Sequence, residues 1–466
     1  MTANIKVDFN AKTGKKVMPL HGFNAGPMTK VFTYDARPWF VEGGFPFARM
    51  HDAEYPYGSG EFVDIPCIFK NFDADENDPA NYNFAQTDEY LRQTLNVGTQ
   101  VFYRLGVSIE HAPAKRYVDP PRDYLKWARI CEHIIMHYNE GWANGYNWDI
   151  KYWEIWNEAD LDKDVENTSL KRCWSGTAEE FGKFYTVTAR YLKERFPDLM
   201  IGGCGFTTST NWFIVKFFDY ISAQSPKVPM DFYSWHRYTP DPKSFVEHAK
   251  MARELLNKYG YGDIPSVLDE WNYSCGRTRK ERAESYKVMK DERGAAFYAA
   301  SLAALQECSD VEIATNFEAD VVKEYCGIFD VDEMCIGGLT RGAEFLATVK
   351  PTKGFYAFKM FNLLYRLGEQ VKLESDGGIF ATAAAGEDGV GVLAANSSKE
   401  AKTVTFDLKG VKGKLTVRMT DKERTNKIIN AIEAGSAMKL TLTLPENSFV
   451  YIGTDLPDPV SEYKYV

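Results

Sequence analysis

The chain has 466 residues, of which 44% are hydrophobic and 26% are charged, and its formal net charge is −10. This size and composition are typical of a globular protein with one large domain and a smaller one. The acidic balance, without a long basic run, argues against nucleic acid as the main partner, because phosphate binding needs a basic stripe.

The start of the chain, "MTANIKVDFNAKTGKK", has no apolar h-region, so the sequence predicts no secretory signal. No segment reaches the roughly 18 apolar residues of a membrane span. The eight cysteines are scattered and form no C-x-x-C pair, which is typical of reduced thiols. We therefore expect a cytoplasmic protein without a membrane partner. The 10 Trp and 27 Tyr residues suit sugar rings, and they equally suit packing in a large core.

Short apolar runs alternate with amphipathic helical patterns over residues 16–345. In chain order, the predicted strands are "VMPLHGFNA", "FPFARMH", "TQVFYRLGVS", "IKYWEIWNE", "LMIGGCGF", "MDFYSWHRY", "PSVLDEWN" and "VEIATNF". From the second strand on, the predicted intervening helices are "TDEYLRQTLN", "RDYLKWARICEHIIMHYNEGW", "TAEEFGKFYTVTARYLKERF", "NWFIVKFFDYISAQ", "PKSFVEHAKMARELLNKYG" and "ERGAAFYAASLAALQE". The third of these helices opens with Thr177 and Glu180 at capping-box spacing.

This alternation predicts a parallel sheet covered by helices, and eight units in about 330 residues fit a (β/α)8 barrel of the TIM type. A doubly wound sheet is the alternative. It is disfavoured because no phosphate-type glycine fingerprint follows the first strand.

Past about residue 365, short alternating runs such as "AKTVTFDL", "GKLTVRMTD" and "MKLTLTL" are separated by turn residues. They predict an antiparallel β-sandwich, which the N-terminal "NIKVDFN" extends by one strand. We therefore expect an N-terminal strand at 1–15, a catalytic barrel at 16–360 and a β-sandwich at 361–466.

The active site of such a barrel lies at the carboxyl ends of its strands. Reactive side chains follow five of the predicted strands there: Arg49 and His51; Asn157 and Glu158; His236 and Tyr238; Asp269, Glu270 and Trp271; and Asn316 and Glu318. Two carboxylates about 5–5.5 Å apart are what retaining glycoside hydrolysis requires.

Glu158 and Glu270 fit this requirement by position, because 270 − 158 = 112 residues corresponds to three β/α units of roughly 37 residues. Strand alternation places Asp269 and Glu270 on opposite faces, but it does not say which face is inward. The residue pattern alone leaves that choice open.

"WEIWNEAD" and "VLDEWN" resemble the two catalytic motifs of retaining glycosidases whose catalytic acids lie on strands four and seven. Within that superfamily the chain is most similar to glycoside hydrolase family 39, the β-xylosidase and α-L-iduronidase family. The likeness covers most of the barrel and includes "NYNFAQTDEYLRQTLNVGTQVFYRLGVS" and "DFYSWHRY". The form "DEWN" in place of "TEWN" also resembles α-L-arabinofuranosidases of family 51.

The resemblance implies roles for the residues at these positions. Glu158 is expected to be the acid/base and Glu270 the nucleophile. Asn157 is expected to bind the sugar 2-hydroxyl, and Arg49 is expected to orient a catalytic carboxylate. The remaining expectations concern the pocket: contacts of His51 and His236 with sugar hydroxyls or the nucleophile, walls formed by Tyr238 and Trp271, and binding of sugar hydroxyls by Glu318. Phe317 stands where the family often has tryptophan.

The resemblance further implies a retaining exo-glycosidase that acts on a glycoside or oligosaccharide, with β-xylosides as the first expectation. An α-L-arabinofuranosidase, another glycosidase of the superfamily and a catalytically inactive carbohydrate-binding barrel remain alternatives. Two intact acids argue against the inactive protein. No cofactor or metal is expected, and homo-oligomerisation is left open.

Four neighbouring polar residues are interpreted as structural. We expect Glu154 to form a salt bridge or to support the site from behind, and Asp160 to be an ordinary loop residue. His133 and His137, one helical turn apart, have no carboxylate among the residues between them, so a satisfied surface pair is preferred over metal ligands.

Overall fold

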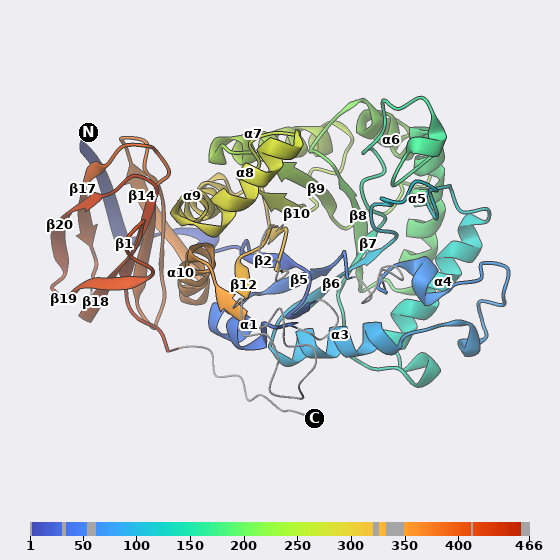
Figure 1. The fold of residues 1–466 in the computed structure, drawn as a ribbon, viewed down its shortest axis with the longest axis horizontal. Coiled ribbons are helices and arrows are strands. Elements are labelled where there is room, and N and C mark those ends of the chain that lie inside the picture. The colour runs from blue at the N-terminus through green and yellow to red at the C-terminus, as the bar shows by residue number, and fades with distance from the viewer. Residues whose placement is uncertain are drawn as a thin grey trace.

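The computed structural model describes residues 2–29, 34–53, 62–319, 326–331, 349–411 and 413–457. They form a closed barrel of eight parallel strands wrapped by helices, and a nine-stranded sheet beside it (Figure 1). The prediction of a TIM barrel followed by a β-domain is confirmed. The doubly wound alternative is wrong, because the strands close on themselves.

The barrel strands are short runs of almost entirely buried residues, as parallel strands covered by helices should be. Neighbours around the barrel follow the order β10-β11-β2-β5-β6-β7-β8-β9. Their bounds are β2 (Gly22–Asn24), β5 (Phe47–Met50), β6 (Gln100–Leu105), β7 (Tyr152–Ile155), β8 (Met200–Phe206), β9 (Tyr233–Tyr238), β10 (Ser266–Asn272) and β11 (Ile313–Asn316). All eight lie within the predicted strand runs.

Most of the helices bury an apolar face against the outside of the barrel. Their bounds are α1 (Arg37–Gly43), α2 (Ile65–Ile68), α3 (Ala85–Asn96), α4 (Tyr124–Asn139), α5 (Ala178–Arg195), α6 (Trp212–Ser222), α7 (Pro242–Lys258), α8 (Arg279–Lys290), α9 (Glu292–Cys308) and α10 (Lys353–Leu367). The capping box of Thr177 and Glu180 at the start of α5 is confirmed. No prediction covered α1, α2, α8 or α10. None of the described helices has a stretch long and apolar enough to cross a membrane.

The second body is a mixed sheet in the order β19-β18-β21-β16-β15-β14-β1-β17-β20. Its strands are β1 (Thr2–Lys16), β14 (Glu369–Ser375), β15 (Phe380–Ala385), β16 (Val390–Asn396), β17 (Lys402–Lys409), β18 (Gly413–Thr420), β19 (Lys427–Ala434), β20 (Ala437–Leu444) and β21 (Ser448–Gly453). Strand β1 lies between β14 and β17, so the prediction that the N-terminal strand joins this sheet is confirmed. Four short strands pair elsewhere: β3 (Met28–Thr29) with β4 (Tyr34–Asp35), and β12 (Phe329–Val331) with β13 (Val349–Pro351).

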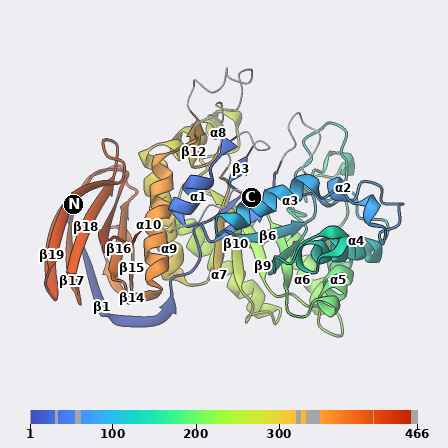
Figure 2. The ribbon, with the colours of Figure 1, turned by 90° about the horizontal axis from the view of Figure 1, so that it is seen from below.

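Helices α9 and α10 join the two bodies. Figure 2 shows both helices between the sheet and the barrel, and both contact β15 and β16. Polar bonds cross the same boundary, since Glu307 accepts hydrogen bonds from Gln370 (2.9 Å) and Thr382 (2.7 Å). Because α10 runs through residue 360 and packs on both bodies, the division of the chain at 360 stays a prediction.

Candidate active site

Alternate residues of "YWEIWNEAD" lie on opposite sides of β7, and Tyr152 and Glu154 share the inner side, where Tyr152 packs against Phe47 and Phe102. Trp153 stacks on Tyr103, while Glu154 points inward to Arg49. After β7 ends, Trp156 takes a positive φ of 76° and packs against Trp127 among the helices. The chain thereby turns at the mouth of the barrel, where the next two residues point inward.

Those two residues are Asn157 and Glu158. Asn157 Oδ1 accepts a hydrogen bond from Arg49 Nη2 at 2.9 Å, whereas its buried Nδ2 has no partner among the described residues. Glu158 has a φ of 47°, and its amide donates to the Gly205 carbonyl at 2.8 Å. Its Oε2 is likewise buried and without a protein partner in the described part of the chain. One amide donor and one carboxyl oxygen are therefore available to a ligand.

A β-bulge resolves the choice between Asp269 and Glu270. The pairing of β10 with both neighbouring strands shifts register after Leu268. As a result, both acids reach the barrel interior: Arg49 Nε lies 3.0 Å from Asp269 Oδ2, and Nη1 lies 3.3 Å from Glu270 Oε2. Simple alternation fails because a bulge places an extra residue in the strand.

The two predicted catalytic carboxyl groups face each other across the mouth. One carboxyl oxygen of Glu158, one of Glu270 and a ring nitrogen of His236 all lie within 4.8 Å of one another. His236 Nδ1 lies 2.9 Å from Glu158 Oε1 and 3.6 Å from Glu270 Oε2. Both glutamates are only 6% exposed, so their chemistry takes place largely away from bulk water.

Glu270 is held by groups from two further strands. Tyr238, at the end of β9, donates its hydroxyl to Glu270 Oε1 at 2.5 Å. His51 Nε2, just past β5, lies 3.7 Å from Glu270 Oε2. Burial raises the pKa of Glu270 and the charge of Glu158 adds to this, while His236, Arg49 and the Tyr238 hydrogen bond oppose it.

Arg49 is the central cation of the site and is fully buried. Besides Asn157, Asp269 and Glu270, its guanidinium contacts Glu154 (Nε to Oε2, 2.8 Å) and Asn24 (Nη1 to Oδ1, 3.0 Å). Glu154 therefore supports the site from behind, as expected, through its contact with Arg49. Asn24, at the end of β2, is a site residue that the sequence analysis missed. Its position at a strand end was the available signal.

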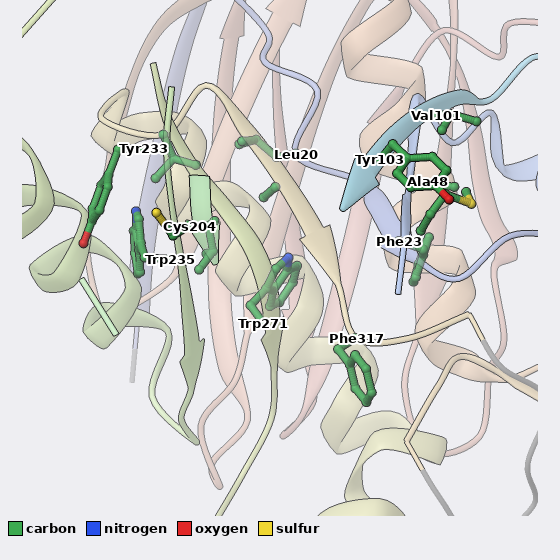
Figure 3. Packing of buried hydrophobic residues seen from close by; sticks show 14 of the residues in the cluster. Leu20, Phe23, Ala48, Val101, Tyr103, Cys204, Tyr233, Trp235, Trp271 and Phe317 are labelled. Carbon is green, nitrogen blue, oxygen red and sulfur yellow. The ribbon is translucent and has the colours of Figure 1, made fainter. Parts of the chain in front are cut away.

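Trp271 does not line the pocket, contrary to expectation. It is fully buried on the outer face of β10, against Phe245 of α7, Tyr298 of α9 and Phe358 of α10. Figure 3 shows it among the buried apolar side chains of the barrel. The bulge at Asp269 and Glu270 leaves the following residue facing outward, so this tryptophan stabilises the helical layer.

The end of β11 supplies the next wall of the site. The ring of Phe317 lies 6.3 Å from the ring of His51, which follows β5. It lies 6.5 Å from the ring of Tyr238, at the end of β9. Glu318 follows it and is 4% exposed, with Cys326 Sγ at 3.7 Å from its Oε1. The sugar-binding role of Glu318 stays a prediction.

Two of the structural interpretations need correction. Asp160 is fully buried and accepts hydrogen bonds from Thr207 (2.9 and 2.6 Å) and Asn211 (2.5 Å), so it anchors the loop after β8. His133 and His137 have hydrogen-bond partners, as expected, but they are buried and do not lie at the surface. His137 bonds Asp88 at 2.9 Å, and His133 Nδ1 lies 2.8 Å from the Arg129 carbonyl. Short-range sequence patterns do not reveal which loops and helix faces become covered.

Among the described residues, one group of three potential metal ligands comes together, and it consists of Glu158, His236 and Glu270 themselves. Arg49 Nη1 lies 3.3 Å from Glu270, and the surrounding acids hold the pKa of His236 well above its ordinary value despite the opposing effect of burial. A protonated imidazole cannot ligate a metal, so this arrangement favours proton chemistry over cation binding.

Comparison with known proteins agrees with this geometry. The chain is 26% identical over 365 residues to a β-xylosidase of Geobacillus stearothermophilus, a match that covers 70% of this chain and 66% of the relative. It is also 26% identical over 257 residues to a β-xylosidase of Caldicellulosiruptor saccharolyticus, covering 50% and 47%. The chain thus spans about two thirds and about half of the lengths of these two relatives.

Solved structures share the fold at lower identity. A glucosidase from Croceicoccus marinus superposes with a TM-score of 0.77 at 22% identity, covering 98% of this chain and all of that one. A monomeric β-xylosidase from Caulobacter crescentus gives 0.67 at 16%, covering 97% and 99%. An α-L-arabinofuranosidase of family 51 from Thermotoga petrophila gives 0.67 at 14%, covering 97% and 100%.

The sequence profile of glycosyl hydrolases family 39 matches residues 42–405, a span that contains all the predicted site residues. Together with the barrel and the facing acids after β7 and on β10, this match shows that the chain belongs to glycosyl hydrolases family 39.

Proposed function

We propose that this chain is a retaining exo-glycosidase that removes terminal sugars, with β-xylosides as its substrates. The observation that carries the proposal is the separation of the two acids, an oxygen of Glu158 and one of Glu270 lying within 4.8 Å. Retaining glycosidases place their carboxyl groups about 5–5.5 Å apart, whereas inverting enzymes need about 6.5–9.5 Å to admit a water molecule. Direct attack by a carboxylate fits this gap.

In the first step, Glu270 attacks the anomeric carbon and forms a glycosyl ester. The bond to the leaving oxygen breaks, and Glu158 donates its proton to that oxygen. Arg49 and Tyr238 hold the attacking carboxylate in its ionised form. The partner-free Nδ2 of Asn157 is placed to donate to the sugar 2-hydroxyl, a contact that strengthens in the transition state.

In the second step, Glu158, now ionised, takes a proton from water while the water oxygen attacks the anomeric carbon. The ester bond to Glu270 breaks and the sugar leaves with its original configuration. Formation of the ester removes the charge of Glu270, which lies beside Glu158 and His236. The loss of that negative charge favours the ionised form of Glu158 in which it acts as base.

The substrate assignment rests on the two related β-xylosidases. An α-L-arabinofuranoside is the second candidate, favoured by "DEWN" on β10 and by the fold shared with the family 51 enzyme. A panel of aryl glycosides, including β-D-xylosides, β-D-glucosides, α-L-arabinofuranosides and α-L-iduronides, tests both. We expect the β-xyloside to have the highest kcat/KM. Cleavage of none of them by folded protein would refute the proposal.

Glu158→Ala provides the matching test of the acid role. The variant should keep most of its first-step rate on 2,4-dinitrophenyl glycosides, whose leaving group needs no proton. It should lose about 10²–10⁴-fold on the corresponding alkyl or sugar glycosides, the usual contribution of a general acid. Pre-steady-state bursts on the two substrate types measure the difference. Equal losses on both types would remove Glu158 from the acid role.

Tyr238→Phe should move the acid limb of the pH profile. The lost hydrogen bond lowers the pKa of Glu270, so without it the carboxylate takes up a proton at higher pH. We expect the acid limb of kcat/KM to shift upward by about 1 pH unit, as removal of one charge-assisted hydrogen bond should. Tyr233→Phe is the matched control, because its hydroxyl on the same strand bonds Ser209 outside the site. Coincident acid limbs for wild type and Tyr238→Phe would contradict this role.

A further inference from the structure

Two buried carboxyl groups lie behind the catalytic pair and take no part in the steps above. Glu154 of β7 and Asp269 of β10 are both 0% exposed, and both contact the guanidinium of Arg49. Both carboxyl groups lie against the same guanidinium nitrogen, since Arg49 Nε is 2.8 Å from Glu154 Oε2 and 3.0 Å from Asp269 Oδ2. Two carboxyl groups that share one guanidinium nitrogen away from water resist ionising together, so one of them holds a proton.

The surroundings of the two groups decide where that proton lies. Asp269 faces two cationic groups, since Arg49 Nε lies 3.0 Å from its Oδ2 and His236 Nε2 lies 3.6 Å from its Oδ1. Glu154 shares Arg49, and its other side-chain hydrogen bond among the described residues comes from a neutral hydroxyl, since Ser234 Oγ donates to its Oε1 at 2.5 Å. The negative charge therefore belongs on Asp269 and the proton on Glu154.

Three residues then form a line from this pair to the acid/base. The carboxylate of Asp269 faces Nε2 of His236, and Nδ1 of the same ring lies 2.9 Å from Glu158 Oε1. His236 is fully buried, so this ring transmits the charge of Asp269 to Glu158 without a competing water shell. Other titratable or charged groups near His236 or its partners are Glu270, Arg49, His51, Tyr238 and Cys204, and on the far side of Glu158 also Asp160, Arg172 and Cys173.

We propose that Asp269 is a positioning residue that, through His236, keeps the proton needed by Glu158 in the site, while a protonated Glu154 leaves the negative charge on Asp269. This inference rests on the proposed function. It gives Asp269 of "DEWN" a positioning role, distinct from the nucleophilic role of Glu270 beside it.

The titration of these groups agrees with the geometry. Burial raises the pKa of Glu154 to about 8 against the opposing charge of Arg49, and Asp269 raises it further. Burial also acts to raise the pKa of Asp269, but Arg49 and His236 outweigh it and bring that pKa down to about 2. His51 stays neutral, because burial and the charge of Arg49 hold its pKa well below the ordinary value.

The test compares Asp269→Asn with Glu154→Gln in the full-length enzyme, by following kcat/KM against pH on the glycoside that the wild type cleaves. Asp269→Asn removes the negative charge next to His236, so the proton shared by His236 and Glu158 leaves at lower pH. We expect the alkaline limb to move down by about 1 pH unit, a tenfold loss on the alkaline side. The loss should be larger for alkyl than for 2,4-dinitrophenyl glycosides, which a merely structural defect would not produce.

Glu154→Gln should behave differently, because glutamine replaces a carboxyl group that is already neutral. It should leave both pH limbs of kcat/KM where the wild type has them, and it remains informative if Asp269→Asn fails to fold. Glu312→Gln is the matched control, since this carboxylate bonds Ser266 at the opposite end of β10. Suppose that the wild type cleaves a glycoside. If the pH limbs of kcat/KM then stay in place in Asp269→Asn, or if a limb shifts in Glu154→Gln, this inference alone is overturned. A folded wild type that cleaves no glycoside overturns the proposed function as well.

Discussion

Glu270→Ala should reduce kcat/KM by at least about 10⁴-fold, equivalent to about 5.4 kcal/mol of transition-state stabilisation, because no other described group is placed to form the glycosyl ester. The carboxylate lies within 4.8 Å of its partner and is held by Arg49 and Tyr238, so its removal leaves a small cavity at the site of attack. Azide fits such a cavity. Added azide should restore turnover and yield a glycosyl azide of inverted configuration, identified by NMR.

The control for this experiment is azide with wild-type enzyme, where the intact carboxylate should exclude azide as the first nucleophile. Asp269→Ala is the informative neighbour, since that side chain also reaches the barrel interior but has no place for direct attack. Rescue of Asp269→Ala by azide, with no rescue of Glu270→Ala, would show that Asp269 and not Glu270 is the nucleophile.

Arg49→Met should destabilise the whole barrel in addition to abolishing activity. The guanidinium is fully buried and contacts three carboxyl groups, Glu154, Asp269 and Glu270. Breaking a buried ion pair by removing one partner costs about 3–5 kcal/mol, because the remaining charges stay buried. Chemical denaturation of the variant at pH 7 should show a loss of this size.

The pH dependence of that loss has a defined sign. Without Arg49, the folded-state pKa of the buried carboxyl groups rises above the unfolded value of about 4, so folding is penalised at any pH where the unfolded groups are ionised. The deficit should therefore shrink as the pH falls toward 4. Arg418→Met is the control, because its pair with Asp455 lies near the surface of the sheet domain and contributes about 0–1 kcal/mol. A deficit for Arg49→Met no larger than that of the control would show that Arg49 is not the central cation.

The barrel could be predicted because its strands are continuous apolar runs between helices with strong periodicity. The missed helices show the limits of that signal. Helix α8, "RKERAESYKVMK", is too polar to show an apolar stripe, although Thr278 and Glu281 form a capping box at its start. Helix α10, "KGFYAFKMFNLLYRL", buries most of its surface between two bodies, so its apolar residues do not follow one face.

The site was predictable down to residue types but not to side-chain directions. Motif spacing placed Glu158 and Glu270 on one rim, which the structure shows. The bulge after Leu268 is set by tertiary pairing, so the sequence indicated neither that Asp269 also points inward nor that Trp271 points outward. Asn24 was missed because its role depends on contacts with distant strands, Arg49 on β5 and the backbone of β10.

The central claim is that Glu270 forms a covalent bond to the sugar. It is tested most directly by incubating the enzyme with 2,4-dinitrophenyl 2-deoxy-2-fluoro-β-xyloside. Its fluorine slows both steps, while its good leaving group keeps the first step fast enough for the glycosyl ester to accumulate. Peptide mass spectrometry should then find one fluorosugar on the peptide that contains Glu270, and none on the Glu270→Gln variant. Labelling of another residue, or rapid turnover of the normal xyloside with an inverted product and no adduct, would contradict the account.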